Sequence, residues 1–214
     1  MGTSIRGVKR FVKLPQLRGV IALNLVVASA GSIVIVNTVS YVRDRLGGSQ
    51  ADVAWTLAAS GGGTLFASLI LPYLLRKFSE RSVMRAGALV LIFGASAAAA
   101  FSVLTPTTIA WTAVVWAVIG GGMALVVTPT GQILRGAVEP KHIPEIFAAQ
   151  FSLSHLAWLV TYPLAGLLGA ATGFTVTWST LAFLAVFGTV AATLLWPRNS
   201  SREPIDTPVK LLAR

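Results

Sequence analysis

Cysteine is absent from the 214 residues, and charged residues are scarce. The lack of cysteine excludes disulfide bonds, thiolate catalysis and cysteine-ligated metals. Charged residues make up 11% of the chain, against about 25% in an ordinary soluble domain. Hydrophobic residues make up 55%, and the mean hydropathy is +0.76. A soluble domain of this size could not bury so much apolar surface, so the composition indicates a membrane protein.

Four long tracts contain no Asp, Glu, Lys or Arg: 19–42, 53–75, 86–134 and 146–197. About 20 apolar residues are enough to cross the hydrocarbon core of a bilayer, so the first two tracts each fit one crossing. The other two are about twice as long as one crossing requires, and each contains a turn signal near its middle, "TPTT" at 105–108 and "ATG" at 171–173. The sequence therefore predicts an all-α fold with six transmembrane helices, at 19–42, 53–75, 84–104, 109–134, 146–170 and 174–196.

The basic residues lie almost entirely on one side of this predicted topology. The side that holds both termini has fifteen Lys and Arg residues, in the arm 1–18, the second loop, the fourth loop and the tail 197–214. The other side has two, Arg43 and Arg45. This asymmetry predicts a multi-pass protein of the inner membrane with both termini in the cytoplasm. The net charge of +10 is explained by these flanks, so no nucleic-acid partner is expected.

Aromatic residues near the ends of the predicted helices fit an interfacial belt. They are Tyr41, Trp55, Trp111 and Trp178 at the outer ends, with Tyr73 and Trp196 at the inner ends.

Two other interpretations of the apolar tracts are weaker. Ala28-Ser29-Ala30 could be a signal-peptidase site, but cleavage would leave 31–42, which is too short to span the bilayer. "GASA" at 94–97 is similar to the Gly-x-Ser-Gly pattern of intramembrane serine proteases, with Ser96 and His155 as a dyad. Ala97 replaces the second Gly, and no oxyanion-hole donor can be identified, so an enzyme is not expected.

Six spans, a basic amphipathic arm and a charged loop between the second and third spans together resemble the C-terminal half of a major facilitator superfamily transporter. The segment 123–169 also looks like the fourth and fifth spans of bacterial efflux-type members. The resemblance implies a 3+3 inverted repeat, in which the first and fourth helices line the cavity, the second and fifth meet the other half, and the third and sixth face lipid. It also implies that "SIRGVKRFVKLPQLRG" at 4–19 is the end of the cytoplasmic connection between two halves. A disordered basic leader is the alternative for this arm.

The loop after the second span looks like a weakened form of the family's cytoplasmic signature. On this alignment Arg76 stands in place of the signature Asp, and Lys77 and Arg81 match its basic positions. Pro72 and Ser79 replace its two glycines. The loss of the acidic residue argues against a conformational latch, and the alternative is a basic loop that only fixes topology.

The predicted fifth span carries His155, the one ionisable residue inside a span. Trp158 and Tyr162 lie on the same helical stripe as His155, within about 60°. Phe151, Ser152, Leu159 and Gly166 complete that stripe. Such a stripe could line a solute cavity; the alternative is a neutral histidine bonded to a neighbouring helix, with aromatic residues that serve packing.

Four further polar residues are candidates for the cavity, Asn24 and Asn37 in the first span and Thr128 and Gln132 in the fourth. At least one of the asparagines is expected to join helices instead. Two prolines inside spans, Pro129 and Pro163, are expected to kink their helices.

The sequence thus predicts one half of an efflux-like secondary transporter that moves a small solute by alternating access. The expected partners are the lipid bilayer, the small-molecule substrate and either an N-terminal half or a second copy of the chain; neither a cofactor nor a metal is expected. The alternative is a non-transporting membrane subunit that stabilises or assembles a partner.

Overall fold

The computed structural model describes residues 2–103 and 108–196, which form seven α-helices. The predicted tail 197–214 and most of the predicted turn at 105–108 lie outside the described residues. The helices are α1 (Gly2–Lys13), α2 (Pro15–Ser40), α3 (Gln50–Lys77), α4 (Glu80–Val103), α5 (Ile109–Gly136), α6 (Ile143–Thr172) and α7 (Phe174–Leu195). A π-helical turn (η1, Tyr41–Arg45) extends α2, and a short 3-10 helix (η2, Pro140–His142) precedes α6.

Local side chains and glycine geometry explain several helix boundaries. Ser49 and Asp52 form a capping box at the start of α3, with Asp52 N donating to Ser49 Oγ at 3.2 Å and Ser49 N donating to Asp52 Oδ2 at 2.7 Å. Thr108 caps α5 by accepting from the backbone N–H of Trp111. Gly173 separates α6 from α7 at a φ of +81°, a conformation that favours glycine. The predicted break at 171–173 is therefore confirmed.

Within the described ranges, six helices are long and apolar enough to cross a membrane. The shortest, α7, has 22 residues and spans about 33 Å at 1.5 Å per residue, slightly more than the hydrocarbon thickness of about 30 Å. This confirms the prediction of an all-helical fold with six membrane-capable helices.

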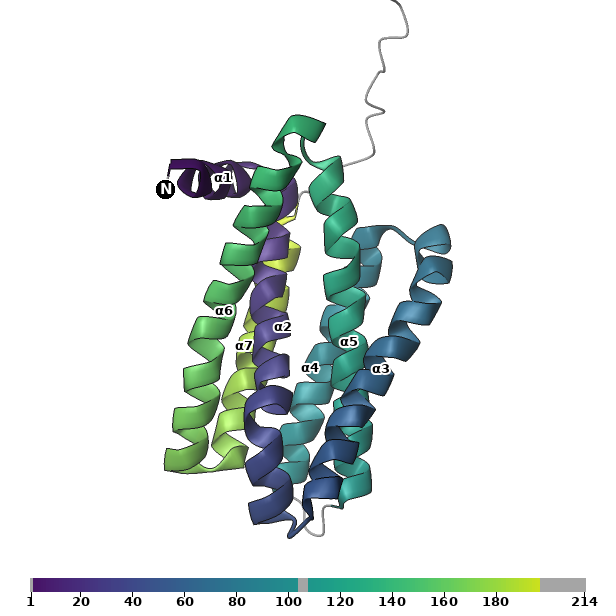
Figure 1. The fold of residues 1–214 in the computed structure, drawn as a ribbon, viewed down its shortest axis with the longest axis vertical. Coiled ribbons are helices and arrows are strands. Elements are labelled where there is room, and N and C mark those ends of the chain that lie inside the picture. The colour runs from purple at the N-terminus through teal and green to yellow at the C-terminus, as the bar shows by residue number, and fades with distance from the viewer. Residues whose placement is uncertain (1, 104–107, 197–214) are drawn as a thin grey trace, which may run out of the picture.

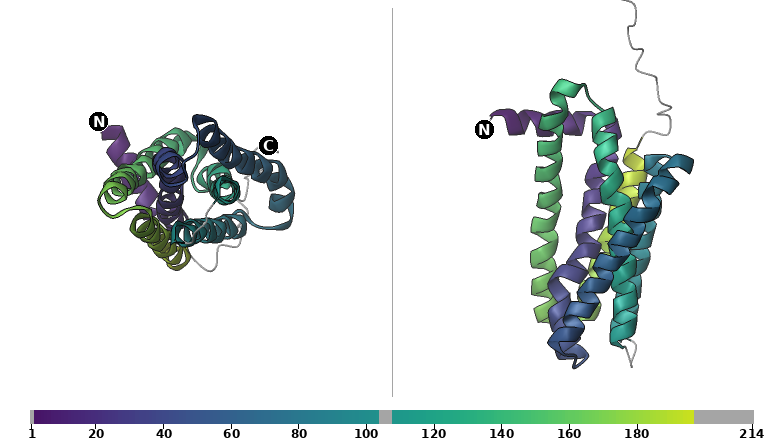
Figure 2. Two further views of the ribbon diagram at one scale, coloured as in Figure 1. Left: turned by 90° about the horizontal axis from the view of Figure 1, so that it is seen from below. Right: turned by 45° about the vertical axis from the view of Figure 1, so that its right-hand side comes forward.

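The six long helices form a bundle in which α2 and α5 lie in front of α7 and α4, and α6 and α3 form the two edges (Figure 1). Of these helices, α2 packs against α7, α6, α5 and α4, whereas α5 packs mainly against α3 and α4. The helix α1 lies across one end of the bundle and contacts α6, as the two views in Figure 2 also show. We call the side formed by α2, α5, α6 and α3 in Figure 1 the front of the bundle.

Glycines allow α3 and α5 to approach at backbone distance. A Cβ atom on Gly63 would lie 1.9 Å from the carbonyl oxygen of Ala117, and one on Gly120 would lie 2.0 Å from that of Ser60. Thr64 Oγ1 also donates to Gly120 O across the same crossing, at 3.1 Å. Small residues are the usual means by which membrane helices pack closely, so Gly63 and Gly120 are packing residues rather than parts of a phosphate loop.

Three aromatic residues that the interfacial belt was expected to contain are instead buried. The rings of Tyr41 and Trp178 are in contact, with centroids 4.5 Å apart and planes tilted by 59°, and both residues are at most 2% exposed. Trp196 is also buried, and its indole N–H donates to Gln16 O, which joins the end of α7 to the start of α2. The buried aromatic rings of these three residues stabilise the packing between helices. The prediction that they belong to the interfacial belt was therefore wrong.

Trp55, Trp111 and Tyr73 are exposed, as the interfacial belt requires.

Candidate solute-binding face

Residues from three helices converge at the middle of the bundle's front. Gly31 lies midway along α2 and its η1 extension, Met123 midway along α5, and Trp158 midway along α6. A Cβ atom on Gly31 would lie 2.3 Å from Trp158 Cη2 and 3.3 Å from Met123 Cε. The indole of Trp158 therefore lies directly against the backbone of α2, with Met123 beside it. We call Gly31, Met123 and Trp158 the central contact.

The residues of α6 beside Trp158 add rings and one ionisable group. His155 precedes Trp158 by three positions and Tyr162 follows it by four, so both lie within about 60° of it around the helix. The Trp158 and Tyr162 rings have centroids 4.9 Å apart, and the His155 and Phe151 rings 4.0 Å apart. The side chains of His155 and Tyr162 are exposed. These three predicted cavity residues thus share one side of α6.

The imidazole of His155 is held by its own helix. Its Nδ1 lies 2.8 Å from Phe151 O and 3.4 Å from Ser154 Oγ. Neither partner belongs to a neighbouring helix, which leaves Nε2 without a hydrogen-bond partner in the part of the chain that the structure describes. His155 and Ser96 do not form a dyad, since Ser96 lies on α4 and the polar contacts of His155 are both within α6.

Asn24 and Gln150 form a reciprocal amide pair between α2 and α6. Asn24 Nδ2 donates to Gln150 Oε1 at 3.3 Å, and Gln150 Nε2 donates to Asn24 Oδ1 at 2.8 Å. Both residues are half-buried. The pair joins the two helices, and Asn24 lies about 10 Å along α2 from Gly31 of the central contact.

Asn37 lies inside the bundle, with 3% of its surface exposed. Its Nδ2 donates to Ala165 O at 3.2 Å, and its Oδ1 accepts from Trp178 Nε1 at 3.1 Å. It therefore ties together α2, α6 and α7. This is the interhelical role that was expected of at least one asparagine, and it leaves Asn37 unable to reach a solute at the front.

The structure does not bring Thr128 and Gln132 to the central contact. Both are exposed. Thr128 follows Met123 by five positions and Gln132 by nine, so they lie about 140° and 180° away from Met123 around α5. Because Met123 faces α2, Gln132 points away from α2.

The two prolines expected to kink their helices lie within continuous helices. Pro129 is buried inside α5 and Pro163 is exposed on α6. Each proline lacks the N–H that would bond the carbonyl four residues earlier, so each helix is missing one internal hydrogen bond.

The predicted cytoplasmic loop residues lie at the same end of the bundle as α1 and pack on aromatic rings. Arg76 Cζ and Lys77 Nζ lie 5.8 Å and 4.6 Å from the ring centroid of Tyr73. Arg81 Cζ lies 5.6 Å from the ring of Trp196, as does that of the neighbouring Arg85. The contacts of Arg76 and Lys77 thus lie within α3, whereas those of Arg81 and Arg85 attach the start of α4 to the end of α7.

Sequence reasoning missed Gly31 and Met123. For Gly31 a signal was present, because it lies in the small-residue run "ASAGS" at 28–32, which indicates a close helix approach. For Met123 the sequence holds no comparable signal.

Comparison with known proteins gives one match. The family model described as Major Facilitator Superfamily matches residues 21–213. No curated protein and no solved structure matches the chain.

Proposed function

The chain belongs to the major facilitator superfamily, whose members transport small solutes, and we propose that it forms the C-terminal six-helix half of an efflux-type transporter. The solute binds at the central contact of Gly31, Met123 and Trp158, and alternating access exposes it to one side of the membrane and then the other. The observation that carries this proposal is the convergence of three helices at their midpoints, because secondary transporters bind solutes near the bilayer midplane.

The distribution of burial supports a second half. Each long helix has a most apolar stretch of 18 residues. In α2 with its η1 extension, 67% of that stretch is buried, whereas in α3 and in α6 only 11% is buried. These two helices form the edges of the bundle's front (Figure 1). The helix α6 also carries the exposed side chain of His155. An ionisable group is costly in lipid, which favours a protein-lined cavity at this position. An N-terminal half or a second copy of the chain would provide the missing wall.

The pattern of helix contacts supports the 3+3 repeat. If the first three long helices are exchanged with the last three, the pairs α2–α6 and α2–α7 become α5–α3 and α5–α4. All four pairs are packed in the structure. The same exchange maps α2 onto α5, the two helices at the front, which are the cavity-lining pair that the family resemblance implies.

The basic end of the bundle supports a cytoplasmic location for both termini. The arm α1 and the loops at 78–79 and 137–142 lie at that end, whereas Arg43 and Arg45 lie at the other (Figure 1). In a bacterial-type inner membrane the more basic side stays in the cytoplasm.

The chemistry of the central contact favours a solute with apolar or aromatic surface. The contact offers an indole, a thioether and a backbone surface, flanked by the phenol of Tyr162 and the imidazole of His155. The charge-free tracts contain no carboxylate, so an acid that couples transport to protons would belong to the other half.

Vesicle flux tests the proposal. The chain is reconstituted alone and together with its partner half, and efflux of a panel of aromatic cations and neutral drugs is measured. Gly31→Val places a branched side chain where Trp158 lies, and it should reduce flux at least about 10-fold, because small displacements of positioning groups have effects of that size. Gly62→Val is the control, since a Cβ atom there meets nothing within 4 Å.

Each outcome has a defined meaning. Flux that needs this chain and is lost in Gly31→Val supports the proposal. Flux by the partner half alone would instead identify this chain as a non-transporting subunit that stabilises the partner. Full flux in Gly31→Val would reject the central contact as the binding site. An unchanged pH dependence in His155→Ala would exclude His155 from coupling.

A further inference from the structure

The arm α1 is docked on the start of α6. The side chain of Phe11, which belongs to α1, is fully buried. Gly7 lies so close to α6 that a Cβ atom would be 2.8 Å from Glu145 O and 2.9 Å from Glu145 Cγ. Arg10 Nη1 adds an ion pair with Glu145 Oε2 at 3.1 Å. The arm is thus attached by apolar packing, close backbone approach and charge together.

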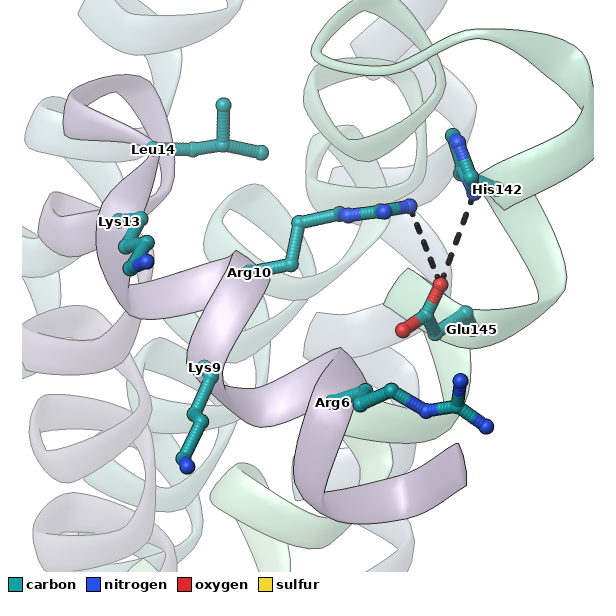
Figure 3. Close-up of a pocket in the computed structure, with 7 residues that line it drawn as sticks. All are labelled: Arg6, Lys9, Arg10, Lys13, Leu14, His142 and Glu145. Carbon is teal, nitrogen blue, oxygen red and sulfur yellow. Dashed lines mark hydrogen bonds and ion pairs between the residues drawn. The ribbon is translucent and has the colours of Figure 1, made fainter. Parts of the chain in front are cut away.

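A cavity of about 510 Å³ lies between the arm and the start of α6 (Figure 3). It is lined by four cations of α1 and by three further residues: Arg6, Lys9, Arg10, Lys13, Leu14, His142 and Glu145. In Figure 3, Arg10 extends from α1 toward Glu145 and His142. We call this cavity the arm pocket.

The charges of the arm pocket are unbalanced. Four cations face a single carboxylate, and Glu145 is already shared by Arg10 at 3.1 Å and His142 at 3.6 Å. Lys9 and Lys13 form no ion pair within residues 2–103 and 108–196. Arg6 lies three and four residues before Lys9 and Arg10, and Lys13 follows them by four and three, spacings at which like charges on a helix repel. An anion in the pocket would relieve this repulsion.

The side chains and the position of the pocket point to a phosphate group. Guanidinium groups bind phosphate oxygens with two parallel hydrogen bonds, and ammonium groups add compact charge. The pocket volume lies within the range of about 300–1,000 Å³ that is typical of small-molecule sites. The arm lies across the bundle where α2 begins, which is the level at which a membrane helix meets the lipid headgroups (Figure 2).

We propose that the arm pocket binds a phosphate group, carried either by an anionic lipid headgroup or by a free phosphate. The bound phosphate neutralises α1 and fastens it to α6. The charge of the cytoplasmic leaflet would thereby act on the helix that carries His155. This proposal concerns phosphate binding only, and it is tested independently of the proposed transport function.

Native mass spectrometry of the full chain in detergent tests it. The probes are phosphatidylglycerol, phosphatidylcholine and inorganic phosphate. The variant is Lys9→Gln with Lys13→Gln, which removes two exposed charges while keeping the Arg10–Glu145 pair. The control is Arg76→Gln with Lys77→Gln, which removes the same charge from the last turn of α3 at the same end of the bundle.

The double lysine variant should bind phosphatidylglycerol about 30-fold more weakly, the factor expected when two cations near an anionic surface are lost. The control should change less than about 3-fold. Phosphatidylglycerol binding that exceeds phosphatidylcholine binding identifies a lipid source. Binding of inorganic phosphate with the same variant pattern, and no preference between the lipids, identifies a soluble source.

Two results would overturn the proposal. One is an equal loss in the lysine variant and the control, which would show general charge attraction. The other is phosphate and lipid binding that the lysine variant leaves intact. Raising the salt concentration should weaken binding in the wild type more than in the lysine variant, because the variant has fewer charges for salt to screen.

Discussion

The crossing of α3 and α5 makes a sharp prediction about two adjacent glycines. Gly63→Ala places a methyl group 1.9 Å from the carbonyl oxygen of Ala117, whereas Gly62→Ala places one where nothing lies within 4 Å. Both substitutions are made in the same helix, at nearly the same depth. They differ in whether the new methyl group faces α5.

The magnitude follows from the distances. Ordinary contact begins at 3.4 Å, so the methyl group of Gly63→Ala forces the two backbones apart by about 1.5 Å. That shift breaks the hydrogen bond from Thr64 to Gly120 O, which costs about 0.6 to 1.7 kcal/mol in a membrane. Overpacking adds about 1 to 3 kcal/mol. The higher helix propensity of alanine offsets about 1 kcal/mol. The expected net loss is about 2 kcal/mol.

The assay is unfolding by SDS in mild detergent, followed by circular dichroism. Gly63→Ala should unfold at a lower SDS fraction than the wild type. Gly62→Ala should match it or gain up to about 1 kcal/mol, because only the propensity effect remains. A difference between the two variants below about 0.5 kcal/mol would refute the close crossing.

Two further predictions concern the interior and the front of the bundle. Asn37→Leu leaves the indole N–H of Trp178 buried without an acceptor and should lower the free energy of unfolding by about 1 to 2 kcal/mol in the same SDS assay; a neutral effect would contradict the buried hydrogen bond. In the assembled transporter, His155→Cys should react with a charged maleimide at least about 10-fold faster than Phe93→Cys, because only the front is expected to face water. Phe93 is a matched control, 68% exposed on α4 and about 20 Å from the start of its helix, against about 18 Å for His155 in α6. Equal labelling of the two would show that the front is not an aqueous path.

The six-helix fold could be predicted from the sequence because the membrane imposes a simple rule. A charge-free tract either crosses the bilayer or turns back, and the turn at Gly173 is readable from the chain. Gly63 and Gly120 could also be assigned to packing, since a phosphate loop has no place inside an apolar span. The exposure of Gly61 and Gly62 could not be predicted, because it depends on where α5 crosses α3.

The candidate site was harder to predict because polarity does not reveal which way a helix faces. Thr128 and Gln132 are polar and inside a span, but they turn away from α2. Asn37 was a reasonable cavity candidate. Its hydrogen-bond partner Trp178 lies 141 residues away in the chain, and no local sequence pattern predicts such a pair. That His155, Trp158 and Tyr162 share one side of α6 could be predicted, because spacing within one helix decides which residues share a side.

The proposed function depends on the bundle crossing the membrane with its two ends on opposite sides. Single cysteines test this topology directly, because the chain has no cysteine of its own. Asp44→Cys and Lys141→Cys place one thiol at an exposed position on each end of the bundle. A membrane-impermeant maleimide added to intact spheroplasts should label Asp44→Cys, and it should label Lys141→Cys only after the membrane is permeabilised. Labelling of Lys141→Cys in intact spheroplasts would contradict the account.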